Sequence, residues 1–205
     1  VLQIADLVTD RATLIGAANT LIFRKDGKIH ADNTDGYGFI ENLKVGALTW
    51  NPKSGPAVVL GAGGASRAVV ASLLDAGVPE ILISNRTRIR AERLAEDFGK
   101  RLQVIDWIQA GNVLEEAELT VNTTSLGMVG HPELRVPLDG LRKGSVVTDL
   151  VYTPLQTNLL REAEAQGCIT VDGLGMLLHQ AAPGFERWFG QRPEVDSATR
   201  AAALR

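Results

Sequence analysis

The sequence predicts a doubly wound α/β fold, in which helices cover both faces of a parallel sheet. Short, wholly apolar runs rich in β-branched residues, such as "AVVLG" from Ala57, are typical of strands buried on both faces. These runs alternate with helical segments over residues 56–173, and such alternation gives parallel strands joined by right-handed crossovers. A glycine-rich turn, "GAGGAS", directly follows the first of these runs.

The first part of the chain predicts a smaller, different arrangement. Residues 1–15 mix apolar and polar side chains and predict a helix that ends near Gly16. The segment "NTLIFRKDGKIHADN" predicts a β-hairpin, because Asp26-Gly27 suits a tight type I′ turn between two apolar runs. A helix over "GYGFIENLKVGA" and a loop over "TWNPKSGP" complete this part.

The doubly wound part is expected to contain six strands, four intervening helices and a final amphipathic helix. The strands are "AVVLG", "EILISN", "QVIDW", "LTVNTT", "GSVVTDLVY" and "CITVDG". The intervening helices are "RAVVASLLDAG", "TRIRAERLAEDFGK", the short "VLEEA" and "PLQTNLLREAEAQG". The final helix, "LGMLLHQAAPGFERWFG", places Met176 and Trp188 in the core, and a tail follows it.

The composition is that of an ordinary globular chain and narrows the classes of function. The 205 residues are 45% hydrophobic and 22% charged, with a net charge of -3. Slight acidity argues against a nucleic-acid or membrane partner, and no apolar run approaches the roughly 18 residues of a spanning helix. The N-terminus lacks the pattern of a signal peptide, and the single cysteine, Cys168, has no disulfide or zinc partner. We therefore expect a cytoplasmic protein without a metal.

The glycine turn predicts a dinucleotide site. Gly61, Gly63 and Gly64 follow a predicted strand and precede a helix, so the backbone can approach a pyrophosphate closely at the helix N-terminus. The third position of the usual G-x-G-x-x-G pattern is Ser66, which is small but is not glycine. The alternative is a glycine turn that serves tight packing alone.

The end of the second strand favours NADP over NAD. An acidic residue there would bind the ribose 2′-hydroxyl of NAD, but "SNRTRIR" contains none. Arg86 can pair with a 2′-phosphate, and Arg90 lies one helical turn further on. Thr87 is expected to cap the helix and to bond the phosphate. Arg88 and Arg93 are expected to lie on a solvated helix face.

The stretch "HADNTDGYGF" places Asp32 and Asp35 three residues apart. A calcium loop is excluded, because the positions after Asp32 lack the required ligands and the final glutamate. A plain polar turn remains an alternative. The nearby "GAANTL" places Asn19 among small residues, and an amide and a carboxylate on adjoining segments can hydrogen-bond a polyhydroxylated substrate.

Seven motifs, in this order, resemble the shikimate dehydrogenase family over essentially the whole chain: "GAANTL", "DNTDGYG", "LGAGGASRA", "NRT", "VNTTSLGM", "DLVYTPLQTNLL" and "DGLGMLLHQAAPGFERW". The resemblance implies a two-domain clamshell with NADP on a Rossmann domain and shikimate in the cleft. It also implies hydride transfer between NADPH and 3-dehydroshikimate, a step of aromatic amino acid biosynthesis in the chorismate pathway, by a monomer or homodimer. Residues 43–173 would form the NADP-binding domain, and residues 1–42 and 174–205 the remnant of the substrate domain.

The resemblance also assigns roles to individual positions. Asp35 would be catalytic, and the substrate-binding residues would be Asn19, Asp35, Tyr152 and Gln180. The cofactor-binding residues would be Gly61, Ala62, Gly63, Gly64 and Ala65 at the pyrophosphate, Asn85, Arg86, Thr87 and Arg90 at the adenosine phosphate, and Leu150 and Gly173 at the nicotinamide. Tyr152 and Gln180 are expected just past strand ends or in the first turn of the next helix, where ligands bind in doubly wound sheets.

The family's proton-transferring lysine, in a segment similar to "V-T-x-P-x-K", would fall a few residues before Val1. About the first quarter of a family member would then lie outside this sequence, and activity of the chain alone is expected to be impaired. Two alternatives stay open. One is a quinate/shikimate dehydrogenase of broader specificity, and the other is a non-catalytic NADP-binding protein with an interaction or regulatory role.

Overall fold

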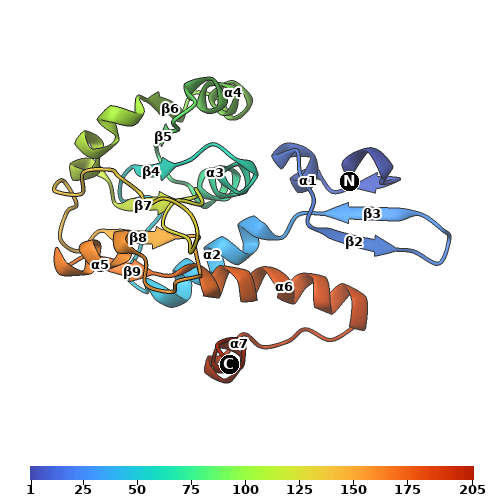
Figure 1. Cartoon of the computed structure of the whole chain (residues 1–205). Helices are drawn as coiled ribbons and strands as arrows, with labels where there is room; N and C mark the ends of the chain where they lie inside the picture. The colour runs from blue at the N-terminus through green and yellow to red at the C-terminus, as the bar shows by residue number, and fades with distance from the viewer.

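The computed structural model describes all 205 residues, which form two sheets connected by helices (Figure 1). The larger sheet contains β4 (Ala57–Leu60), β5 (Ile81–Ser84), β6 (Leu102–Ile105), β7 (Leu119–Asn122), β8 (Val146–Asp149) and β9 (Ile169–Val171). Its order is β6-β5-β4-β7-β8-β9, and every pair of neighbours is parallel. The predicted doubly wound sheet of six parallel strands is confirmed.

Helices cover both faces of the larger sheet, and its central strands β4, β5, β7 and β8 are buried along their whole length. They are α3 (Gly64–Ala76), α4 (Arg88–Phe98), α5 (Asn158–Ala165) and a 3-10 helix, η2 (Trp107–Glu116), which is longer than the short helix predicted there. Within β4, Val59 packs into a core with Val69 of α3, while Val58 packs into a second core with Leu114 and Leu159. Successive side chains of a strand point to opposite faces, so each face of the sheet has its own core.

The smaller sheet contains β1 (Leu7–Val8), β2 (Thr20–Phe23) and β3 (Ile29–Asp32), in the order β1-β3-β2. The prediction of one helix over residues 1–15 is wrong, because β1 pairs in parallel with β3. Only η1 (Leu2–Ile4) and α1 (Asp10–Ile15) are helical in this stretch. Thr9 stops the helix from extending backwards, since its hydroxyl accepts from the N–H of Ala12 at 3.2 Å as an N-cap. The predicted end at Gly16 is confirmed.

The predicted hairpin is confirmed, but its turn type is wrong. β2 and β3 are antiparallel neighbours, with Phe23 opposite Ile29. A type I′ turn needs positive φ at both central residues, and only Gly27 has one, at 82°. The N–H of Gly27 donates to the carbonyl of Arg24 at 3.0 Å, so a longer loop with glycine in the left-handed region closes the hairpin.

Two long helices join the sheets: α2 (Asp35–Gly46) and α6 (Gly173–Phe189). Figure 1 shows α6 running from the larger sheet to the smaller one. The two helices cross closely at glycines. A Cβ on Gly38 would lie 2.7 Å from the backbone N of Gln180, and one on Gly175 would lie 1.9 Å from the Asn42 side chain. The close crossing fixes the smaller sheet relative to the larger one.

At the end of the chain, one of the two side chains predicted for the core is not buried. Met176 is buried as predicted, but Trp188 is 54% exposed, and its indole N–H donates to the carbonyl of Leu21 at 2.9 Å. The tail contains a short helix, α7 (Ser197–Ala203). Its Arg200 forms an ion pair with Asp172, the N-cap residue of α6. No helix in the structure combines the length and the hydropathy that crossing a bilayer would need.

Candidate active site

The strands of the larger sheet end in a common row at their carboxyl edge. Leu60 of β4 is in register with Ser84 of β5 and Asn122 of β7, and Asn122 is in register with Asp149 of β8. The segments that follow this row begin with Gly61, Asn85, Thr123 and Leu150. Strand order reverses at β4, and ligands of doubly wound sheets bind in the crevice at such a switch point. Seven of the eleven predicted cofactor residues directly follow β4 or β5 here, at Gly61–Ala65 and Asn85–Arg86.

The glycine turn has the geometry of a phosphate-binding elbow. Gly61 has φ of 111°, and a Cβ there would lie 2.5 Å from the hydroxyl of Thr123, so only glycine fits. Cβ atoms on Gly63 or Gly64 would meet nothing within 4 Å, which leaves open space over the N-terminus of α3. The first N–H groups of a helix have no partner within it, so this space suits a pyrophosphate.

Ser66, at the non-standard third position, completes the elbow. Its side chain is fully buried, and its hydroxyl accepts from the N–H of Gly63 at 3.0 Å and bonds the hydroxyl of Thr123 at 2.6 Å. Thr123 in turn donates to the carbonyl of Leu60 at 2.8 Å. The serine therefore keeps the small volume that helix–strand packing needs and adds a hydrogen bond that glycine could not make.

Asn85 and Thr87 lie in the short segment between β5 and α4. The Asn85 side chain accepts from the N–H of Ala62 at 3.2 Å and donates to the carbonyl of Thr87 at 2.8 Å, so it joins the elbow to the start of α4. Thr87 is the N-cap residue of α4, but its side chain makes no capping hydrogen bond, contrary to prediction.

The two arginines predicted for the 2′-phosphate differ from their neighbour. Arg86 and Arg90 are exposed, and neither guanidinium forms an ion pair or hydrogen bond within the chain. Arg88 instead pairs with Glu92 at 2.7 Å and with Asp106. Two exposed cations without a competing carboxylate fit a phosphate at this strand end.

The predicted substrate amide and carboxylate are in direct contact. The Asn19 amide donates to Oδ1 of Asp35 at 2.7 Å and to the hydroxyl of Thr34 at 3.0 Å, while its oxygen accepts from the N–H of Thr34 at 3.0 Å. Burial raises the pKa of Asp35, and hydrogen bonds from Asn19 and Asn33 oppose that rise. The pair thus presents a carboxylate whose proton affinity is above its ordinary value.

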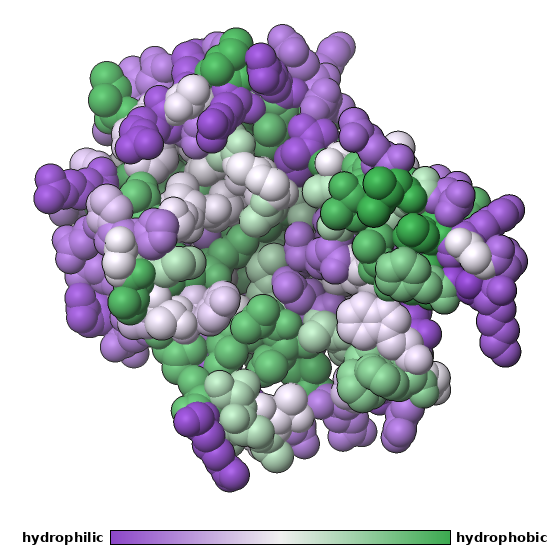
Figure 2. All heavy atoms as spheres, turned by 45° about the vertical axis from the view of Figure 1, so that its right-hand side comes forward, coloured by the Kyte–Doolittle hydropathy of each residue, from purple (hydrophilic) through white to green (hydrophobic).

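The amide–carboxylate pair lies beside the helix that begins at the elbow. Arg67 of α3 donates to the carbonyls of Ile15 and, at 3.3 Å, Leu14, just before the segment that carries Asn19. Directly after Asp35, a Cβ on Gly36 would lie 3.2 Å from the carbonyl of Ala68 in α3. Figure 2 shows the molecular face hollowed between its larger and smaller parts.

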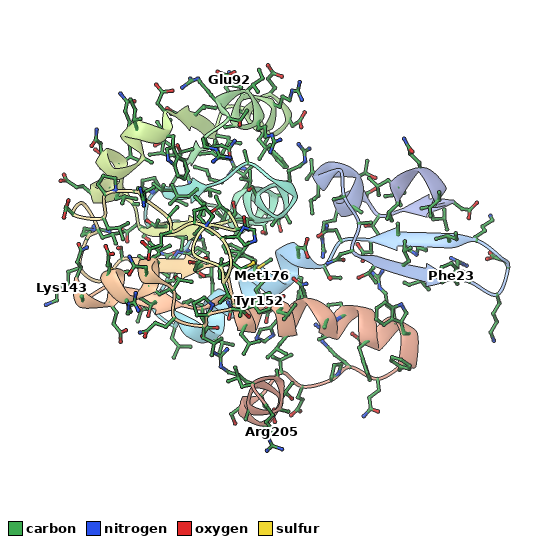
Figure 3. The ribbon with its side chains drawn as sticks, viewed as in Figure 1. Phe23, Glu92, Lys143, Tyr152, Met176 and Arg205 are labelled. Carbon is green, nitrogen blue, oxygen red and sulfur yellow. The ribbon has the colours of Figure 1, made fainter.

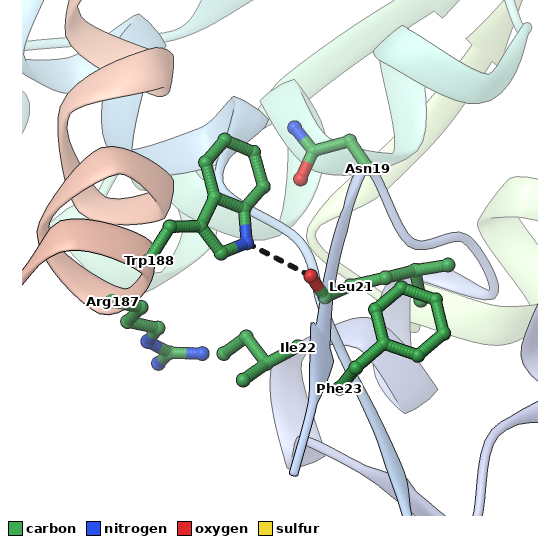
Figure 4. Close-up of a pocket in the computed structure, with 6 residues that line it drawn as sticks. All are labelled: Asn19, Leu21, Ile22, Phe23, Arg187 and Trp188. Carbon is green, nitrogen blue, oxygen red and sulfur yellow. Dashed lines mark hydrogen bonds between the residues drawn. The ribbon is translucent and has the colours of Figure 1, made fainter.

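Asn19 also borders a pocket of about 590 Å³ on the smaller sheet (Figure 4). The pocket lies between β2 and the last turns of α6, and its lining residues are Asn19, Leu21, Ile22, Phe23, Arg187 and Trp188. Phe23, one of these lining residues, is 76% exposed. The lining beyond Asn19 is mainly apolar.

The other two predicted substrate residues lie in different settings. Tyr152, labelled in Figure 3, lies in the loop that follows β8, as predicted, and is 42% exposed. Gln180 is in the middle of α6, so the prediction of a first-turn position is wrong. The long α6 begins at the sheet edge, but Gln180 lies two turns along it, where it packs against Gly38 of α2, one turn from Asp35.

Leu150 and Gly173, predicted for the nicotinamide end, touch each other. A Cβ on Gly173 would lie 2.3 Å from the carbonyl oxygen of Leu150, so the backbone there tolerates no side chain. Asp172 caps α6 by accepting from the N–H of Leu174 at 3.0 Å. These contacts place the start of α6 against the turn after β8.

Comparisons with known proteins agree with this geometry. The family model for shikimate / quinate 5-dehydrogenase matches residues 48–129, and that for the shikimate 5'-dehydrogenase C-terminal domain matches residues 173–203. The chain is 71% identical over 204 residues to the NADP(+) shikimate dehydrogenase of Cereibacter sphaeroides and 68% identical to that of Roseobacter denitrificans. It spans 73% and 74% of those two proteins, respectively, and both alignments cover the whole chain. The chain belongs to the shikimate dehydrogenase family.

Solved structures of the shikimate dehydrogenase family and of a related enzyme share this fold. Shikimate 5-dehydrogenase of Thermus thermophilus, in complex with NADP(H) and shikimate, has a TM-score of 0.86 at 40% identity and covers 99% of the chain and 74% of its own. Quinate dehydrogenase of Corynebacterium glutamicum, in complex with NAD, has a TM-score of 0.91 at 33% identity. The match covers 99% of the present chain and 73% of the quinate dehydrogenase chain.

Sequence reasoning missed a polar network at the same edge of this family member. Asn122 and Asp149, at the ends of β7 and β8, are buried and bonded to each other at 2.9 Å. The signal was present, because a strongly polar residue, Asn or Asp, ends each of the two buried strands "LTVN" and "VVTD". Nothing in the sequence indicated that the two side chains would meet.

Proposed function

We propose that this chain carries the cofactor site and part of the substrate site of an NADP-dependent shikimate dehydrogenase. The reaction would be reversible hydride transfer between NADPH and 3-dehydroshikimate. The observation that carries the proposal is the Asn19–Asp35 pair, held beside α3, the helix whose N-terminus forms the glycine elbow. A substrate bound to that pair would lie near a dinucleotide bound at the elbow.

The cofactor residues would act in three groups. The N–H groups after Gly61 and at the start of α3 would hold the pyrophosphate. Arg86 and Arg90 would bind the 2′-phosphate, and Asn85 would hold the two loops together. The contact of Leu150 with Gly173 would support the nicotinamide half. When bound, NADP supplies the hydride acceptor and NADPH the donor.

The substrate residues would bind and orient a hydroxylated ring. The Asp35 carboxylate accepts hydrogen bonds from substrate hydroxyls, and the Asn19 amide fixes the orientation of that carboxylate. Reduction of a ketone also needs a proton at the oxygen, and the raised pKa of Asp35 suits a group that shares or directs that proton. Tyr152 and Gln180 would complete the substrate site from the two neighbouring segments.

The two sheets would correspond to two domains. Residues 43–173 would form the NADP-binding domain, and residues 1–42 with 174–205 would belong to the substrate domain. The separate hydrogen bonding of the two sheets supports this division. The packing of α2 against α6 would join the domains and set the distance between their sites.

Steady-state rates of the full-length gene product test the proposal. We expect shikimate with NADP to give the highest kcat/KM among four combinations, shikimate or quinate with NADP or NAD. The likeness to a quinate dehydrogenase solved with NAD favours one alternative, a quinate/shikimate enzyme of broader specificity. Comparable rates with quinate would support that alternative, while markedly better use of NAD would contradict the role given to Arg86.

A further inference from the structure

A buried carboxylate without a role so far lies at the end of β8. Asp149 is 1% exposed, and its oxygens accept three hydrogen bonds. Oδ1 accepts from the Asn122 side chain at 2.9 Å and from the N–H of Val151 at 3.0 Å. Oδ2 accepts from the hydroxyl of Thr157 at 2.7 Å. One carboxylate therefore joins the end of β7, the turn after β8 and the N-cap of α5.

The same network orders the loop after β7. The Asn122 oxygen accepts from the N–H of Thr124 at 3.0 Å and from its hydroxyl at 2.7 Å, and the Asn122 amide donates to the carbonyl of Leu126 at 3.1 Å. The N–H of Val129 donates to the carbonyl of Thr153 at 2.9 Å, which binds this loop to the loop after β8. Two neighbouring loops at the cofactor edge thus depend on one hydrogen-bonded cluster.

The charge of Asp149 gives this cluster a single arrangement. Burial raises its pKa from 3.8 to about 6, and the hydrogen bonds from Val151, Thr157 and Asn122 oppose the rise. At neutral pH the group is therefore an ionised carboxylate, which only accepts hydrogen bonds. A buried charge is unfavourable unless such bonds satisfy it. The carboxylate thus orients the amide of Asn122 and the hydroxyl of Thr157.

We propose that Asp149 is a positioning residue for the nicotinamide half of the dinucleotide, an inference that rests on the NADP site proposed above. Asp149 holds the backbone of Leu150 and Val151 in place, and Leu150 is the residue that touches Gly173. The adenosine half would lie over β5. Asn85 and Arg86 there share no hydrogen bond with the network. Loss of the carboxylate would therefore displace the backbone that supports the nicotinamide half of the cofactor and leave the site of the adenosine half in place.

Binding of two ligands can distinguish the nicotinamide half of the site from the adenosine half. NADPH contains both, whereas adenosine 2′,5′-bisphosphate contains the phosphorylated adenosine without the nicotinamide. Calorimetric titrations of the chain would compare the wild type with Asp149→Asn, Thr157→Val and Thr157→Ser. Ser145→Ala is the matched control, because Ser145 is buried at the opposite end of β8 and its hydroxyl donates to the carbonyl of Arg142 at 2.7 Å.

We expect Asp149→Asn and Thr157→Val to raise the Kd of NADPH roughly tenfold or more, while the Kd of the bisphosphate changes less than about twofold. Thr157→Ser keeps the hydroxyl and is expected to bind both ligands as the wild type does. Equal weakening of both ligands, or no weakening, overturns the inference. If Asp149→Asn does not fold, the two Thr157 variants decide the question. A wild-type chain that binds neither ligand overturns the NADP site itself, and this inference with it.

Discussion

The side-chain amide of Asn19 donates a 2.7 Å hydrogen bond to Oδ1 of Asp35. The bond joins the residue before β2 to the first residue of α2, and these lie 16 positions apart in the sequence. It also opposes the rise that burial causes in the pKa of Asp35. The amide therefore orients the carboxylate and favours its ionised form.

Asn19→Ala is expected to raise the pKa of Asp35 further. Removal of the amide takes away a hydrogen bond that stabilises the ionised form, whereas the opposing effect of burial remains. A carbon-detected NMR titration of the Asp35 carboxyl measures the change. Asn51→Ala, in the loop before β4, serves as a control. An unchanged or lower pKa would refute the coupling.

Asp35→Asn is expected to lower kcat for shikimate oxidation by about 10²-fold or more, because the amide cannot take the proton-directing role of a carboxylate. The Kd of NADPH should stay unchanged, since Asp35 lies in the first turn of α2 and not in the elbow. Asp26→Asn, in the exposed hairpin loop, is the matched control. Equal loss of cofactor affinity would count against the assignment.

Arg86→Gln is expected to raise the Kd of NADPH roughly tenfold to a hundredfold and to leave that of NADH unchanged. Only NADPH carries the 2′-phosphate that the guanidinium would pair with. Arg88→Gln provides the control, because Arg88 already pairs with Glu92 and Asp106. Fluorescence titration of both reduced cofactors gives the ratio, and a parallel loss for NADH would exclude this role.

Gly63→Ala is expected to weaken NADPH binding without unfolding the chain. Its φ is -98°, and a Cβ there would meet nothing within 4 Å, so the melting temperature should hardly change. The added methyl would instead occupy the space for the pyrophosphate. Gly175→Ala gives the opposite pattern, with a loss of about 1–3 kcal/mol in stability, because its Cβ would overlap the Asn42 side chain. Thermal melts and titrations of both variants test the contrast.

Protonation of Asp149 is expected to increase the free energy of unfolding of the chain as the pH falls from 7.5 to 5. Its folded-state pKa, about 6, lies above the ordinary value of 3.8, so protonation through pH 6 relieves an unfavourable buried charge. The gain is on the order of 1 kcal/mol over this interval and is complete only below the ordinary value. Urea unfolding of the wild type and Asp149→Asn at both pH values isolates this contribution. An equal pH dependence in the two proteins would contradict it.

The local pattern of the sequence determined the six strands of the larger sheet, the glycine elbow, the hairpin and the end of α1 at Gly16. Each depends on a few neighbouring residues, such as the apolar run "AVVL" or the left-handed position of Gly27. The pattern misjudged residues 1–9, because the pairing of β1 with β3 is a contact between distant residues. It also misplaced Trp188, whose indole reaches across to the carbonyl of Leu21.

The sequence by itself thus identified the fold class, the elbow and the residue types at the site. Only the tertiary structure decided which of these groups meet: Asn19 with Asp35, Leu150 with Gly173, and Asp149 with both Asn122 and Thr157. Helical and strand periodicity report which face of an element is buried, but they do not report its partner. The partners were set by strand register and by the close α2–α6 crossing at Gly38 and Gly175, which depend on contacts between distant parts of the chain.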